Sequence, residues 1–505
     1  MSHFRERKAI LALVAGSAIA LSMPGLGVGP LVFVALVPLF AAIEKGRGFL
    51  AGLLAGVAFF AVDLRWLLTL CRFSWLVVPG YLILVVYLAA YFGLFCFLMA
   101  WVRGKRGFDG RLIVLAPLCF ALLEMLRACG PLGIGFSALY LSLYRYPALI
   151  QIAAIAGPWA VTAAIVCVNA SLYLAVRKSA VYLLVAGGIV GFLAAFSLCS
   201  DPQAGGTLDV AVVSSAVPQE KKLDGRNLLL LLERYNSLGK QAAETEPDLI
   251  VFPESILPGY IMRDERLFPA FKDLAKEADA RILFGTGDYR NGEIYNSVVL
   301  LSPDGTTVGT YDMVHPVPFG EYIPGRALLQ RIGLGRFANS FLSQDLARGR
   351  EYAPVDGIGT PICFEATFPI AARAMVRNGA VLLVTVTNDA WFAGSSELRA
   401  HFAAAVFRAV EARRTLIQAA NGGVSGIVDS RGRILHEVVG EAVLHAEVVK
   451  RANKSLYSQY GDALLYAIFG VSGLVAIVVP KARRAWSTKK TTAGGGDNNP
   501  PPISH

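Results

Sequence analysis

The chemistry available to this sequence centres on one cysteine, Cys363. Six of the seven cysteines lie in strongly apolar N-terminal segments or at their edges, and only Cys363 falls in the long polar stretch between residues 200 and 460. A single thiol cannot form an intramolecular disulfide within that stretch. Cys363 is therefore either an inert packed side chain or a free thiol kept for chemistry.

A cysteine nucleophile needs a base to form the thiolate, donors for the oxyanion of a tetrahedral intermediate, and a pocket for the acyl group. Glu254 directly follows an apolar run and Pro253. A half-buried carboxylate has a raised pKa and can accept a thiol proton. Alone, Glu254 could equally be a solvated loop carboxylate, so its role depends on whether the fold brings it to Cys363.

The composition indicates a membrane protein. The 505 residues are 55% hydrophobic and 17% charged, and the mean hydropathy of +0.53 is too high for an ordinary soluble chain. Apolar stretches of a length suited to a bilayer core of ~30 Å predict eight spans. They lie at about 9–23, 29–43, 49–70, 77–102, 111–128, 149–176, 181–199 and 462–480. The first could be a signal peptide, but it shows no clear cleavage pattern and is interpreted as a retained span.

Lysine and arginine near span ends predict the orientation, because these residues are held on the cytoplasmic side. An inside N-terminus places most basic clusters on one face, so both termini are expected in the cytoplasm and residues 201–460 outside it. The net charge of +10 then largely reflects basic residues near the span ends, which set the orientation in the membrane. No nucleic-acid binding is expected. The predicted division is a seven-span bundle at 1–200, an outer domain at 201–460, an eighth span at 461–482 and a disordered tail at 483–505.

The outer domain alternates β-rich runs with helical patterns, which predicts an α/β fold. The expected strands are 208–215, 248–253, 281–286, 297–302, 307–312, 360–364, 380–387 and 423–429, and the expected helices are about 219–242, 264–279, 366–378 and 397–414. Reactive side chains gather where the strands of such sheets end. Three expected strand ends carry polar residues, at 253–255, 363–365 and 387–391.

Four blocks together resemble the apolipoprotein N-acyltransferase family. They are DLIVFPES (248–255), YDMVHPVPFGEYIP (311–324), ICFEATFP (362–369) and TNDAWF (387–392). The resemblance implies an α-helical bundle of eight spans and a nitrilase-like αββα sandwich inserted between the seventh and eighth spans, in the bacterial inner membrane. It covers nearly the whole chain, since the predicted spans and the position of the insert agree as well.

The resemblance also implies the reaction. Glu254 acts as general base and Cys363 takes an acyl chain from a phospholipid as a thioester. The thioester is then passed to the N-terminal α-amine of a diacylglyceryl-modified apolipoprotein. No metal or cofactor is expected, and the protein is expected to be a monomer. The supporting site residues are Glu321, Glu365, Phe364 and His315, and the substrate-binding candidates are Trp391, Asn388, Glu124 and Arg127.

Two of these roles have open alternatives. Glu124 and Arg127 near the end of the fifth expected span could bind a phospholipid headgroup or form a structural salt bridge. Trp391 could contact an acyl chain or could be ordinary packing.

One position departs from the family. Its catalytic triad is Glu, Lys and Cys, and the lysine position is Met313 here. Methionine keeps the length of lysine and loses the charge, which costs on the order of 10²–10³ in rate at an oxyanion site. His315 is a candidate substitute donor. Three hypotheses follow: an active acyltransferase, a non-enzymatic paralogue that binds lipid or lipoprotein, and a membrane-tethered amidase or other nitrilase-type hydrolase.

Overall fold

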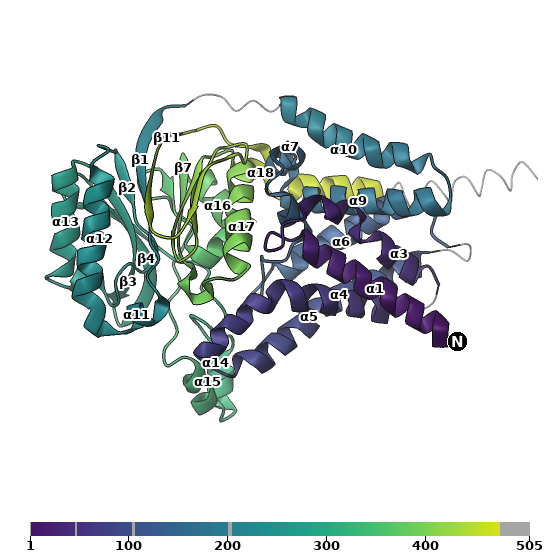
Figure 1. The fold of residues 1–505 in the computed structure, drawn as a ribbon, viewed down its shortest axis with the longest axis horizontal. Helices are drawn as coiled ribbons and strands as arrows, with labels where there is room; N and C mark the ends of the chain where they lie inside the picture. The colour runs from purple at the N-terminus through teal and green to yellow at the C-terminus, as the bar shows by residue number, and fades with distance from the viewer. Residues whose placement is uncertain (1, 46–47, 104–106, 200–204, 475–505) are drawn as a thin grey trace, which may run out of the picture.

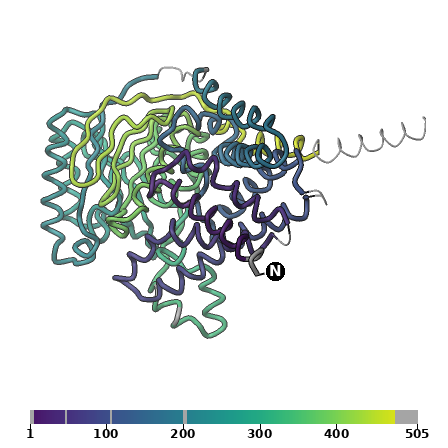
Figure 2. The backbone as a smooth tube through the Cα atoms, turned by 45° about the vertical axis from the view of Figure 1, so that its right-hand side comes forward, coloured from purple at the N-terminus to yellow at the C-terminus, as the bar shows by residue number. Residues whose placement is uncertain are grey.

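The computed structural model describes residues 2–45, 48–103, 107–199 and 205–474. The N-terminal residues form a bundle of helices, and the strands follow from residue 207 onward. Figure 1 shows the two parts side by side, with α1 to α10 on one side and the sheets on the other, and Figure 2 shows the same separation after a turn of 45°.

Apolar helices make up the bundle. The longer ones are α1 (Ser2–Ser22), α4 (Phe49–Asp63), α5 (Val77–Val102), α6 (Leu112–Arg127), α9 (Pro158–Arg177) and α10 (Tyr182–Cys199), and the shorter ones include α2 (Val32–Ala35) and α3 (Val37–Ile43). Among the described residues, three helices are long and apolar enough to cross a membrane: Phe49–Arg72, Val77–Val102 and Pro158–Arg177. Shorter apolar helices cover Gly29–Ile43, Pro147–Ala156, Tyr182–Leu198 and Ala463–Leu474. Eight spans therefore remain a prediction, and the end of the eighth, like the tail at 483–505, lies outside the described residues.

The expected span at 149–176 is interrupted. Two short helices, α7 (Pro147–Ile150) and α8 (Ala153–Ala156), precede α9, which begins only at Pro158. Gly157 between α8 and α9 has φ +80°, a conformation that side chains rarely adopt. A Cβ at this position would also lie 2.5 Å from the ring of Tyr457. Gly157 and Pro158 together therefore cause the break. A prediction from hydropathy alone does not detect it, because hydropathy does not reflect backbone conformation.

Two sheets form the core of the outer part. The first has six strands in the order β11-β1-β2-β3-β4-β5 and the second five in the order β10-β9-β8-β7-β6. The bounds in the first are β1 (Thr207–Ser214), β2 (Leu249–Val251), β3 (Arg281–Arg290), β4 (Glu293–Leu301), β5 (Thr307–Asp312) and β11 (Ala442–Val449). Those in the second are β6 (Ile358–Gly359), β7 (Leu382–Asn388), β8 (Leu416–Asn421), β9 (Val424–Val428) and β10 (Ile434–Val439).

Helices cover the outer face of each sheet. The first is covered by α12 (Leu228–Ala243) and α13 (Leu267–Ala278), and the second by α16 (Pro369–Arg377) and α17 (Glu397–Ala412), as Figure 1 shows. Successive residues along β2 and just after it point to opposite faces of the sheet and so belong to two different hydrophobic clusters. Leu249 and Val251 face the second sheet, while Ile250 and Phe252 face the helices. The expected αββα layering is thereby confirmed. In such a fold the carboxyl ends of the parallel strands are where site residues are expected.

The expected strand at 360–364 is wrong. The strand β6 ends at Gly359, and the short 3-10 helix η6 (Cys363–Thr367) replaces the predicted run, with Ile362 retaining one parallel bridge to Val386. Pro361 cannot donate to a ladder, which explains why pairing stops there. The strands β8, β10 and β11 were not predicted, and the expected helix 219–242 is divided into α11 (Gln219–Leu223) and α12.

The bundle contacts the second sheet through η2 (Leu64–Arg72), which packs on η7 (Asp389–Phe392). Arg72 Nη2 donates to the backbone oxygens of Ala390 at 2.8 Å and Trp391 at 3.0 Å. These contacts join an apolar helical segment to the loop after β7, so the end of that strand lies against the bundle.

Candidate active site

Cys363 is presented by a strained turn. It opens η6 with φ +47°, a left-handed conformation that is uncommon outside glycine and that clusters at functional sites. Burial, together with the nearby Glu254 and Asp389 carboxylates, raises the pKa of the Cys363 thiol well above its usual range. The side chain therefore rests as a thiol, and nucleophilic chemistry requires a base beside it.

Glu254 lies where such a base is needed. It follows β2, is only 6% exposed, and its carboxylate interacts with the Cys363 thiol. Burial raises the pKa of Glu254, which suits proton acceptance near neutral pH. Gly285 on β3 allows the close approach, since a Cβ there would lie 2.6 Å from the Cα of Glu254. The structure thus brings together the two residues that the sequence analysis selected first.

Met313 occupies the same cluster. It follows β5, is 1% exposed, and its backbone N–H donates to the carbonyl of Asn296 at 2.8 Å. The Met313 sulfur lies 3.7 Å from Asn296 Nδ2, and the same nitrogen donates to Glu254. A side chain at position 313 therefore reaches the amide that binds Glu254, and in this chain it brings no charge there.

Asn296 is a site residue that the sequence analysis missed. Its Nδ2 donates to Glu254 Oε1 at 2.7 Å and to Glu321 Oε1 at 3.1 Å, so one amide links two buried carboxylates. Burial, followed by the charge of Glu254, raises the pKa of Glu321 to about 7. Glu321 therefore lies in the same cluster as Glu254, and its supporting role stays a prediction. Asn296 lies within β4. In the sequence, nothing distinguishes a strand residue that faces the site from any other polar residue of a strand.

Glu365 holds the nucleophile turn in place. Its Oε1 accepts the backbone N–H groups of Val314 at 2.7 Å and His315 at 2.9 Å, and its Oε2 accepts that of Ile362 at 3.0 Å. The hydroxyl of Tyr311 also donates to it. Glu365 therefore ties the segment after β5 to the residue before Cys363.

Phe364 and His315 belong to an aromatic cluster beside this turn. The ring of His315 lies 4.5 Å from that of Phe368 and 6.0 Å from that of Phe364. Burial, and next the positive charge of Arg348, lower the pKa of His315. A neutral imidazole at this place does not replace the lost lysine charge.

Lys222 is a second residue that the sequence analysis missed. It lies on α11 with 4% exposure, and its Nζ donates to the backbone oxygen of Glu254 at 3.4 Å. Burial lowers the pKa of Lys222 to about 7, against the opposing influence of the Glu254 charge. The lysine stands beside an exposed lysine, Lys221, in the run QEKKLD, and nothing in that run indicates which of the two is buried.

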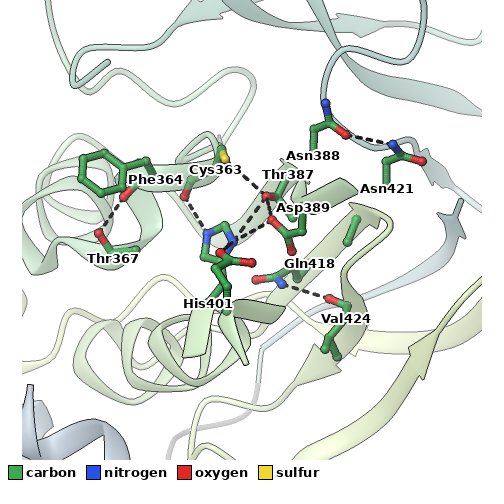
Figure 3. A network of polar contacts seen from close by, with 12 residues as sticks. Cys363, Phe364, Thr367, Thr387, Asn388, Asp389, His401, Gln418, Asn421 and Val424 are labelled. Carbon is green, nitrogen blue, oxygen red and sulfur yellow. Dashed lines mark hydrogen bonds and ion pairs between the residues drawn. The ribbon is translucent and has the colours of Figure 1, made fainter. Parts of the chain in front are cut away.

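A buried polar network underlies Cys363 (Figure 3). His401 on α17 contacts the Cys363 carbonyl through Nε2 at 2.8 Å and Asp389 Oδ1 through Nδ1 at 3.0 Å. The Thr387 hydroxyl donates to Asp389 and lies 3.4 Å from the Cys363 sulfur. His401, Asp389 and Glu397 lie close enough to hold a metal ion, although none was expected. His401 was not singled out because it lies far along the chain on a largely apolar helix.

The candidate substrate residues at the end of β7 differ in their surroundings. The amide of Asn388 is engaged within the protein, donating to Gln219 Oε1 at 2.9 Å and accepting from Asn421 Nδ2 at 2.8 Å. Trp391 is partly exposed, and its ring lies 5.1 Å from that of Phe73 in an edge contact. Trp391 thus stands where the bundle meets the site, while Asn388 joins β7 to β8 and to α11.

Glu124 and Arg127 lie deep in the bundle. The two Glu124 oxygens accept from the Leu139 N–H at 2.9 Å and the Thr162 hydroxyl at 2.7 Å, and Arg127 Nη1 donates to the Phe136 carbonyl at 2.8 Å. These bonds fasten the segment after α6. Both residues also line a small pocket with aromatic walls. Headgroup binding by the pair remains a prediction.

Comparison with known proteins finds two family matches along the chain and similar proteins over nearly its whole length. Residues 15–171 match the family described as Apolipoprotein N-acyltransferase N-terminal domain, and residues 217–449 match Carbon-nitrogen hydrolase. The chain is similar to an apolipoprotein N-acyltransferase of Geobacter metallireducens, with 35% identity over 93% of this chain and 95% of the relative. A second, from Gloeobacter violaceus, is 31% identical over 95% of this chain and 96% of the relative.

Among solved structures, a carbon-nitrogen hydrolase from Helicobacter pylori G27 is similar to the outer part. The identity is 20%, the match covers 48% of this chain and 89% of the other, and the TM-score is 0.36.

Proposed function

Since the chain belongs to the apolipoprotein N-acyltransferase family, we propose that it transfers an acyl chain from a phospholipid to the N-terminal amine of diacylglyceryl-modified apolipoproteins. The observation that carries the proposal is the pairing of Cys363 with Glu254 in a buried site. That pairing suits formation of an acyl-enzyme.

In the first half-reaction, Glu254 accepts the thiol proton and the Cys363 sulfur attacks the ester carbonyl of the phospholipid. The C–S bond forms, the ester C–O bond breaks, and the proton held by Glu254 goes to the leaving alkoxide, which departs as lysophospholipid. The first backbone N–H groups of η6 have no partner within the helix. The N–H of Phe364, directly after the nucleophile, is placed to donate to the developing oxyanion.

In the second half-reaction, the α-amine of the lipid-modified cysteine attacks the thioester. Nitrogen bonds to the acyl carbon, the C–S bond breaks, and the amine gives a proton to Glu254, from which the Cys363 thiol recovers it. The products are an amide-linked acyl chain and the free enzyme. Neither step requires a cofactor.

The contact between bundle and site supports delivery of lipid substrates from the membrane. Trp66 on η2 packs against Phe392 at 4.8 Å and against Phe136 at 5.4 Å, and Phe136 lies 6.2 Å from Phe364. A continuous aromatic path thus leads from the bundle to the residue after the nucleophile. Apolar side chains along such a path suit acyl chains, and Trp391 beside Phe73 fits the same use.

The proposed location is the bacterial inner membrane, with eight spans, the 201–460 domain in the periplasm and both termini in the cytoplasm. The Lys and Arg distribution supports it. Two exposed positions test it: a membrane-impermeant thiol reagent applied to spheroplasts should label Glu244→Cys, directly after α12, and should miss Ala180→Cys between α9 and α10. The reverse labelling would contradict the orientation. The protein is expected to act as a monomer.

The direct test is an acyl-enzyme trap. Purified full-length protein is mixed with phosphatidylethanolamine vesicles, and intact-mass measurement should show one acyl chain on Cys363, released by a diacylglyceryl peptide with a free N-terminus. Rapid loss of the acyl group to water without an amine would indicate a hydrolase. Absence of acylation under conditions that acylate a relative with lysine at position 313 would indicate a protein that only binds lipid or lipoprotein.

A further inference from the structure

The ring of His401 faces hydrogen-bond acceptors at both nitrogens. Nε2 lies 2.8 Å from the carbonyl oxygen of Cys363, and Nδ1 lies 3.0 Å from Oδ1 of Asp389. A carbonyl oxygen only accepts, so Nε2 must carry a hydrogen. Between an imidazole nitrogen and a carboxylate the proton stays on the imidazole, which is the more basic by about 2–3 pH units in model peptides. Both ring nitrogens are therefore protonated, and the ring carries a positive charge.

The surroundings keep this charge in place. His401 and Asp389 are each 1% exposed, so water does not compete for their contact. The titratable groups that face the ring are Asp389 from η7, the Cys363 thiol from η6, and Glu397 on α17 itself, whose Oε1 lies 3.6 Å from Nδ1. Burial, and next the charge of Asp389, raise the pKa of Glu397 well above its usual range, so Asp389, whose Oδ1 lies 3.0 Å from Nδ1, is the main counterion of the ring. Burial lowers the pKa of His401, but the Asp389 carboxylate, together with Glu397 and the Cys363 carbonyl, raises it to about 9.

Thr387 connects this ion pair to the reactive sulfur. Its hydroxyl lies between Asp389 Oδ1 and the Cys363 sulfur, 3.4 Å away, as Figure 3 shows. The hydroxyl has one hydrogen. While Cys363 is a thiol, that hydrogen goes to Asp389. Once the thiolate forms, the hydroxyl can turn to the sulfur, and Asp389 still holds the N–H of His401.

We propose that His401 is a positioning residue held as a permanent imidazolium, which fixes the Cys363 carbonyl and, through Asp389 and Thr387, stabilises the Cys363 thiolate. The proposal rests on the acyl-transfer function above and deepens it. His401 moves no proton during the cycle. It places a positive charge near the nucleophile, in a site to which position 313 brings none. The ring also restrains the peptide that gives Cys363 its left-handed conformation.

Thiol reactivity tests the proposal without depending on acyl transfer. The full-length protein in lipid nanodiscs is treated with iodoacetamide at pH 6 to 10, and alkylation of Cys363 is followed by peptide mass spectrometry. His401→Gln keeps a donor for the carbonyl and removes the charge, and Thr387→Val removes the hydroxyl at nearly constant shape. His436→Gln, at an exposed histidine on β10, is the matched control.

Both site variants should raise the apparent pKa of Cys363 by about one unit or more, which slows alkylation at neutral pH by about tenfold. The control should follow the wild-type curve. A wild-type curve in His401→Gln and Thr387→Val would overturn the proposal, even if their melting temperatures fall, because a merely structural role does not move the thiol titration. A shifted curve without phospholipid acylation would leave the inference standing and count against the proposed function.

A measurement on the wild-type protein covers the case in which the variants do not fold. Nitrogen NMR of protein labelled at histidine should show one histidine with both ring nitrogens protonated from pH 6 to 8. A neutral tautomer or a metal-bound nitrogen at His401 in that range would overturn the proposal.

Discussion

Asn296 donates one hydrogen bond of 2.7 Å to Glu254, from an amide nitrogen that also contacts Glu321 and lies next to the Met313 sulfur. A neutral amide thus stands between two buried carboxylates in a cluster to which position 313 brings no cation. A hydrogen bond to a charged group contributes about 1.5–3 kcal/mol, whereas two carboxylates left without a donor would repel each other.

Replacing Asn296 should therefore raise the pKa of Glu254. In Asn296→Leu the hydrogen bond that lowers this pKa is lost, and the base is deprotonated only at higher pH. The acidic limb of the pH profile for Cys363 acylation should move up by about one to two units, with a fall in rate at pH 7 of about tenfold or more. An unchanged profile measured by single-turnover acylation would show that Asn296 does not act on Glu254.

Met313→Lys should speed acylation. The new ammonium would lie beside Glu254 and Glu321, lower the pKa of the Cys363 thiol, and stabilise the oxyanion in both half-reactions. The gain in transition-state stabilisation is about 2–4 kcal/mol before the cost of burying the lysine is deducted. Single-turnover acylation is compared with Met313→Leu, which keeps the packing without the charge. A faster wild type would mean that this chain uses a different oxyanion site.

Lys222→Met should slow acylation by about tenfold at pH 7. Lys222 is the buried lysine beside Glu254, and its partial positive charge helps to keep that carboxylate ionised. The exposed neighbour provides a matched control, Lys221→Met, which should retain the wild-type rate. The double variant with Met313→Lys should regain activity if either ammonium can serve Glu254. Equal rates in Lys222→Met and the wild type would exclude this role.

Cys363→Ala should abolish acyl-enzyme formation and transfer. Replacing the other six cysteines together by alanine should preserve activity, because they are small hydrophobic side chains in or near apolar helices. Small hydrophobic thiols without a base to form the thiolate are unreactive. The six are Cys71, Cys96, Cys119, Cys129, Cys167 and Cys199. Intact-mass measurement after exposure to phospholipid distinguishes the two variants. Any acyl adduct on Cys363→Ala would show that another residue is the nucleophile.

Glu321→Gln should stabilise the protein at pH 8 more than at pH 5. The pKa of Glu321 is raised to about 7 in the folded state, above about 4.3 in the unfolded chain. Its contribution to stability is therefore fully present below about pH 4 and is lost as the pH rises through 7. Melting temperatures at the two pH values check this, with the exposed Glu351→Gln as control. An equal change at both pH values would show that Glu321 is not buried as a raised-pKa carboxylate.

The sequence alone determined what local composition and short motifs encode. Apolar runs marked most of the helices of the bundle, and alternation between strand and helix patterns marked the α/β domain. Cys363 and Glu254 stood out because their residue types and neighbours fit one chemistry, and the block around Met313 revealed the missing charge. The prediction failed at Thr360–Phe364, where β propensity was outweighed by Pro361 and by the left-handed Cys363.

Only the tertiary structure decided which polar residues share the site. Lys222, Asn296 and His401 are far from Cys363 in the sequence, and nothing in their immediate neighbours distinguishes them from exposed lysines, strand residues or helix residues. The helices α11 and α17 and the antiparallel strand β4 bring them to the site, and burial and neighbouring charges then shift the pKa of Lys222 and of His401. Desolvation and the distance to a counterion depend on the packed three-dimensional arrangement, which is why the protonation of His401 and Lys222 could not be read from their residue types.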